Sequence, residues 1–157
     1  MIFLVILSLC IFAAYMTVMI TRYGIRELVS EYAYAGGMGL FSLCIGVNAA
    51  LLLPVMVAVA PEGCKFLGFL AAASLLFVAA APHYKGDEAC LHKTAAKVAG
   101  VCAVVWALAV CWEVVALSLI AYVAVMQVAD KRYGWIAAEI VGMGMVYATC
   151  VYRLLTT

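Results

Sequence analysis

The strongest constraint on this chain is a series of apolar runs that are each long enough to cross a membrane. A transmembrane helix needs about 20 mainly apolar residues, because the hydrocarbon core of a bilayer is about 30 Å thick. Hydrophobic residues make up 70% of the chain and charged residues 11%, so a soluble fold of this size would leave much apolar surface in water. The four plainest runs are residues 1–20, 38–60, 66–81 and 133–155. We therefore expect an all-α fold, a polytopic transmembrane helical bundle forming a single integral membrane domain over residues 1–157.

A fifth apolar stretch, residues 98–129, decides the number of spans. Glu113 is its only charge, and as one continuous helix it would be about 48 Å long at about 1.5 Å per residue. We expect a break near Cys111, Trp112 and Glu113, since Trp and a charged residue suit a turn at the membrane interface. Such a break predicts six spans, whereas an unbroken helix would leave five.

The distribution of Lys and Arg favours six spans. With six spans, seven of the nine basic residues share one side of the membrane, and with five spans, six of them do. Cytoplasmic loops carry the excess of Lys and Arg, so we expect both termini outside and a location in the cell membrane, as for a bacterial inner membrane protein. Lys65 and Arg153 then lie outside, and the cytoplasmic residues are Arg22, Arg26, Lys85, Lys93, Lys97, Lys131 and Arg132.

The net charge and the cysteines exclude several kinds of partner. A formal net charge of +1 leaves no basic surface for nucleic acid, and none of the seven cysteines forms a CxxC pair. We expect no nucleic-acid partner, no cofactor and no metal. The expected partners are the lipid bilayer and a second copy of the chain or another membrane protein. A disulfide between Cys64 and Cys111 stays open, because both would lie on the outer side.

The first loop predicts a short helix on the cytoplasmic surface. Over residues 24–34, an apolar stripe recurs at helical spacing, formed by Ile25, Leu28, Val29 and Tyr32. The glycine-rich residues 36–39 should end this helix before the second span.

The second span contains a buried polar candidate, Asn48. Ser42, Gly46 and Ala50 form a row of small residues that allows close helix packing around it. Asn48 is expected either to bond across to another helix or to line a substrate path, and Pro54 is expected to kink the helix.

The loop after the third span, residues 82–97, contains both histidines of the chain and several charged residues. A helix is expected to begin at Glu88, with Asp87 as its N-cap. Glu88 and His92 are then four residues apart, on one face. They are candidate site residues, but neither an HExxH motif nor a set of three histidines accompanies them.

Glu139 is the most unusual acid of the chain. It lies seven residues beyond Arg132, which places it about 10 Å along a continuous helix. Small residues at Ala138, Gly142, Gly144 and Ala148 predict close helix contacts there, so we expect Glu139 to face the bundle interior. Ionisable residues within a span are functional candidates by default.

Several short motifs resemble small six-span membrane proteins of unknown function found in bacterial genomes. They are SEYAY at residues 30–34, PHYK at residues 82–85 and LHKTAA at residues 91–96, followed by the acid early in the last span. The resemblance implies the six-span layout and no particular activity.

Two functions remain open at this point. The first is a non-enzymatic, self-associating helical bundle that acts as a channel- or transporter-like subunit. The alternative is a membrane enzyme that acts on a lipid or lipid-linked substrate at the cytoplasmic face. The candidate residues for either function are Glu139, Asn48, His92 and Glu88.

Overall fold

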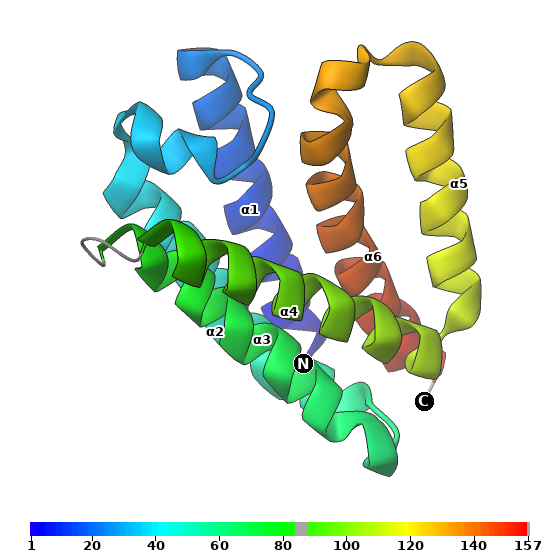
Figure 1. Cartoon of the computed structure of the whole chain (residues 1–157). Coiled ribbons are helices and arrows are strands. Elements are labelled where there is room, and N and C mark those ends of the chain that lie inside the picture. The colour runs from blue at the N-terminus through cyan, green and yellow to red at the C-terminus, as the bar shows by residue number, and fades with distance from the viewer. Residues whose placement is uncertain (84–87, 157) are drawn as a thin grey trace.

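The fold is a bundle of α-helices, as the apolar runs predict. The computed structural model describes residues 1–83 and 88–156, with only the backbone of residues 88 and 89. No strand occurs among these residues. The helices are α1 (Ile2–Tyr23), α2 (Met38–Val59), α3 (Lys65–Ala80), α4 (Glu88–Val110), α5 (Trp112–Val128) and α6 (Gly134–Thr156), shown in Figure 1.

Five helical segments in the described part of the chain are long and apolar enough to cross a membrane. They include α1, α2, α3, α4 and α6. The remaining helix, α5, has 17 residues. At about 1.5 Å per residue it is about 26 Å long, near the lower limit for a span. It runs back along α6 in the opposite direction (Figure 1).

The predicted break in residues 98–129 is confirmed. α4 ends at Val110 and α5 begins at Trp112. Between them, Cys111 has an extended backbone, with φ −160° and ψ 91°. Cys111 and Cys64 are both free thiols, so the disulfide left open by the sequence is not formed here.

The predicted surface helix over residues 24–34 is wrong. Residues 24–30 form turns without helix, and a short π-helical turn follows at Ala33–Gly37. Hydrogen bonds of a side chain within the loop replace the helical ones: the Tyr32 hydroxyl donates to the Gly24 carbonyl over 2.9 Å and accepts from the Arg26 N–H over 3.3 Å. The expected break by glycine is present, since Gly36 has φ +111°, a conformation that suits glycine.

Close packing of α2, α3 and α4 forms one side of the bundle. The indole N–H of Trp106 donates to the carbonyl of Met56 over 3.1 Å near the end of α2. Gly68 makes room for this contact, because a Cβ there would lie 3.0 Å from the Trp106 Nε1. Gly46 of α2 likewise lies close to α3, because a Cβ placed on it would lie 3.8 Å from the Cβ of Ala79, as its row of small residues predicts.

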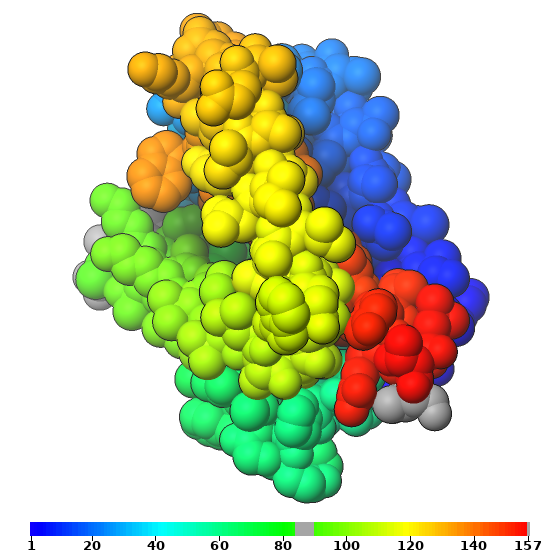
Figure 2. Space-filling model, turned by 90° about the vertical axis from the view of Figure 1, so that its right-hand side faces the viewer, coloured from blue at the N-terminus to red at the C-terminus, as the bar shows by residue number. Residues whose placement is uncertain are grey.

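The α5 helix lies at the edge of the molecule. None of its residues is buried, and in Figure 2 it lies across the face turned toward the viewer, in yellow. Its large apolar side chains are exposed, including Leu117, Leu119 and Ile120. This exposure is the normal state of a helix surface that contacts lipid.

Candidate functional site

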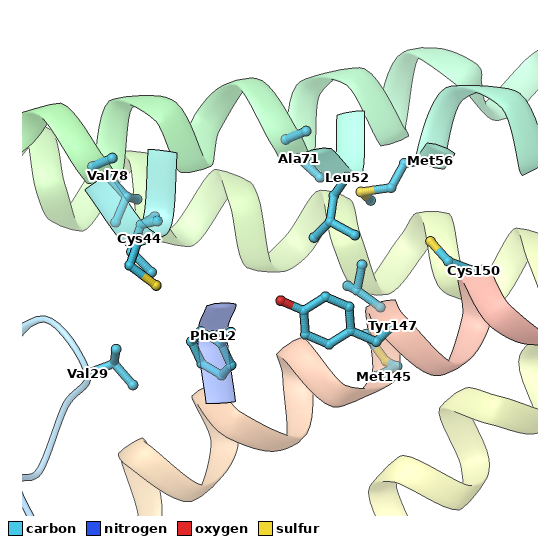
Figure 3. Packing of buried hydrophobic residues seen from close by; sticks show 14 of the residues in the cluster. Phe12, Val29, Cys44, Leu52, Met56, Ala71, Val78, Met145, Tyr147 and Cys150 are labelled. Carbon is cyan, nitrogen blue, oxygen red and sulfur yellow. The ribbon is translucent and has the colours of Figure 1, made fainter. Parts of the chain in front are cut away.

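A cavity of about 490 Å³ lies inside the bundle. Its walls come from α1, α2, α3, α4, α6 and the turn at Val29 and Ser30. Figure 3 shows part of the wall, with Phe12 on α1, Leu52 on α2 and Val78 on α3. This volume is within the roughly 300–1,000 Å³ typical of small-molecule sites.

The two ends of the cavity differ in chemistry. The polar wall residues come from the first loop and from the first halves of α4 and α6: Ser30, His92, Lys97, Trp135 and Glu139. The opposite end is formed by apolar residues near the end of α2, the start of α3 and the middle of α6: Leu52, Met56, Ala71, Met145 and Val146. The cavity is therefore amphipathic along its length.

Glu139 lies at the polar end, half-buried between α6 and the first loop. Its Oε2 accepts a hydrogen bond from the backbone N–H of Val29 over 2.7 Å. No ion pair to Glu139 occurs within the part of the chain that the structure describes. The nearby Glu31 adds negative potential at this carboxyl group. The site therefore has an acid with one protein hydrogen bond and no ion pair among the described residues.

His92 also lines the cavity. Its ring lies 6.4 Å from that of Phe41, centroid to centroid. The Nδ1 atom of His92 is buried without a hydrogen-bond partner among the described residues. Tyr15 Oη and Thr149 Oγ1 share this condition, but neither residue lines the cavity.

Small residues on α4 and α6 border the cavity: Ala96, Ala99, Gly100, Ala103, Ala138 and Gly142. No atom lies within 4 Å of a Cβ placed on Gly100 or Gly142. The close helix contact predicted for Gly142 and Gly144 is therefore wrong within one chain, because both glycines face open space. At Gly142 the missing side chain leaves room for the cavity.

The cavity opens sideways between α4 and α6. Ala96, Lys97, Gly100 and Val104 on α4 and Trp135 on α6 line it and are also exposed. Figure 2 shows a hollow between α4, in light green, and the first half of α6, in orange, beside α5. Both helices that border the opening are long and apolar enough to cross a membrane.

Asn48 lies outside this cavity and joins three helices. Its Oδ1 accepts hydrogen bonds from Ser8 of α1 over 2.5 Å and from Tyr147 of α6 over 2.6 Å. Its amide group donates to the Cys44 carbonyl over 2.8 Å. Ser8, Asn48 and Tyr147, here called the polar clamp, are all buried. Of the two expectations for Asn48, the bond across to other helices is the one observed.

The structure thus brings Glu139 and His92 to one cavity and places Asn48 in the polar clamp. The side chain of Glu88 lies outside the described residues. Sequence reasoning missed Ser8, Tyr147 and Val29. Ser8 and Tyr147 could have been found as isolated hydroxyl groups within apolar spans. Nothing in the sequence indicates that the backbone N–H of Val29 would bond to a distant side chain.

Residues suited to binding a metal do not gather in the described part of the chain, where no group of three His, Cys, Asp or Glu side chains could hold an ion.

Comparisons with protein-family models, with curated proteins and with solved structures found no match for the chain.

Proposed function

We propose that this membrane protein is a non-enzymatic, transporter-like subunit that holds a small, mainly apolar molecule in its cavity. The observation that supports this most directly is the cavity of about 490 Å³, with apolar walls and a few polar groups at one end. Small-molecule sites have this form, because apolar surface provides affinity and a few polar groups provide orientation.

The lateral opening favours uptake from lipid. A molecule dissolved in the bilayer would reach the cavity between α4 and α6 without crossing water. In the proposed six-span arrangement with both termini outside, the polar end lies toward the cytoplasm, where basic loop residues gather. Self-association through the exposed face of α6 near Gly144 completes the proposal, since small residues permit close helix contact in lipid.

The test is equilibrium binding of radiolabelled 1-decanol to the protein in nanodiscs, with empty nanodiscs subtracted. We expect saturable binding. The variant Gly142→Leu places a side chain in the cavity and should weaken binding at least ~10-fold, or about 1.4 kcal/mol. Gly39→Leu is the matched control, since Gly39 also has open space around it and does not line the cavity. Binding no greater than in empty nanodiscs, or equal losses in both variants, would refute the proposal.

A membrane enzyme is the second candidate, because His92 and Glu139 line one cavity. A histidine and a carboxyl group are the usual pair for proton transfer. This candidate predicts a chemically altered lipid after incubation of the protein with total membrane lipid, detected by mass spectrometry and lost in His92→Phe. Recovery of every lipid unchanged would favour the transporter-like subunit.

A further inference from the structure

We infer that the molecule held in the cavity is a single-chain amphiphile with a cationic amine head group, whose head contacts Glu139. The inference rests on the function proposed above and adds the chemical class of the ligand. Its basis is the arrangement of polar and apolar groups along the cavity and the charge at its polar end.

The polarity of the cavity matches an amphiphile rather than a uniformly apolar molecule. The polar wall residues belong to the first loop and to the first halves of α4 and α6, and only apolar side chains come from the end of α2 and from α3. A head group at the polar end would direct its chain toward Leu52, Met56 and Ala71. Trp135 at the opening is a residue type that favours the membrane interface, where such head groups lie.

The charge inside the cavity favours a cation. Glu139 has one hydrogen bond from the protein, and the second carboxyl group near it is that of Glu31. Lys97, the basic residue of the wall, is exposed at the opening rather than buried beside Glu139. An ammonium group donates several hydrogen bonds, and a charge-assisted bond to a carboxylate is strong in an apolar environment.

His92 adds a second unsatisfied polar atom to the wall of the cavity. Its Nδ1 is buried in the described structure without a partner, and its ring lines the cavity. A neutral imidazole nitrogen without a proton accepts a hydrogen bond. This nitrogen adds to the polar character of the cavity wall, while Glu139 is the group that the head group is inferred to contact.

The experiment compares 1-decylamine, 1-decanol and decanoate in zwitterionic nanodiscs, each corrected with empty nanodiscs. We expect decylamine to bind the parent protein at least ~10-fold more tightly than decanol, as one charge-assisted bond would provide. In Glu139→Gln the ratio of the two affinities should fall to ~1. Glu113→Gln is the charge-matched control, because Glu113 is exposed on α5 and does not line the cavity.

The outcomes separate the two proposals. Decanol binding with no preference for decylamine would overturn the amine inference and leave the cavity function standing. Preferential binding of decanoate that is lost in Lys97→Gln would overturn it in favour of an anionic ligand. Absence of binding by all three compounds would overturn the proposed function itself. The comparison of ligands on the parent protein decides the question even if Glu139→Gln does not fold.

Discussion

Two groups of polar side chains lie within the bundle, and they differ in how the protein uses them. In the polar clamp, the Oδ1 of Asn48 accepts two hydroxyl hydrogen bonds of 2.5 and 2.6 Å, and its amide group donates to its own helix. At the polar end of the cavity, Glu139 has one bond, from the N–H of Val29, and the Nδ1 of His92 has none among the described residues.

The number of hydrogen bonds that each polar group makes within the protein separates structural residues from candidate binding residues. Polar groups in an apolar bundle stabilise helix contacts when other protein groups satisfy them. Polar groups beside a cavity retain the capacity to bind something else. By this criterion Asn48 has a structural role, and Glu139 and His92 are the candidates for ligand binding, although all three are polar residues within apolar spans.

The largest effect is expected from breaking the polar clamp. Asn48→Leu leaves the hydroxyls of Ser8 and Tyr147 buried without their acceptor, and should lower the free energy of unfolding by about 2 kcal/mol. Tyr147→Phe removes one of the hydroxyls and should cost about 1 kcal/mol. Unfolding in mixed micelles with increasing SDS measures both values. An Asn48→Leu protein as stable as the parent would show that the polar clamp is not structural.

Glu139 should respond in the opposite way. Glu139→Gln keeps an oxygen acceptor for the Val29 N–H and removes a charge from an apolar site, so its free energy of unfolding should not fall. Glu139→Ala removes the acceptor, and amide hydrogen exchange at Val29 should become about 10-fold faster. Exchange followed by mass spectrometry measures the loop directly. Equal exchange at Val29 in the alanine variant and the parent would remove the basis for this contact.

A third face of α6 is the expected site of self-association, separate from both groups of polar side chains. Gly144 and Ala148 are exposed and line neither the cavity nor the polar clamp. Gly144→Leu should shift the detergent-solubilised particle to a smaller size while leaving decanol binding unchanged. Size-exclusion chromatography with light scattering measures the mass. An unchanged mass would exclude this face as the site of self-association.

The smallest effect is expected from thiol labelling, which tests on which side of the membrane the polar end of the cavity lies. Six spans with both termini outside expose Cys64 outside and Cys90 inside. A membrane-impermeant thiol reagent applied to intact cells should then modify Cys64 and spare Cys90. Cys111 should also be spared, because it is buried. Reaction of Cys90 from outside would reverse the orientation and place Glu139 toward the outer face.

The helices were predictable from the sequence to a large extent, because long apolar runs in lipid have few alternatives to helix. The break at Cys111 was also predictable from length and from Trp112 and Glu113. The conformation of the first loop was not predictable. Its apolar residues have helical spacing, but the N–H of Val29 bonds to Glu139, which lies 110 residues away in the sequence. The cavity was not predictable either. Small residues such as Gly142 can permit close packing or leave space, and only the neighbouring helix decides.

The contacts between the beginning and the end of the chain set the order in which the protein can be completed during synthesis. Ser8 lies 139 residues from Tyr147, and Val29 lies 110 residues from Glu139. The ribosome must therefore complete α6 before α1 acquires its last bonds and before the first loop reaches its final conformation. Until α6 is in place, the Oδ1 of Asn48 lacks the hydroxyl of Tyr147 and the N–H of Val29 lacks its acceptor. A chain that stops before α6 would keep these groups unsatisfied.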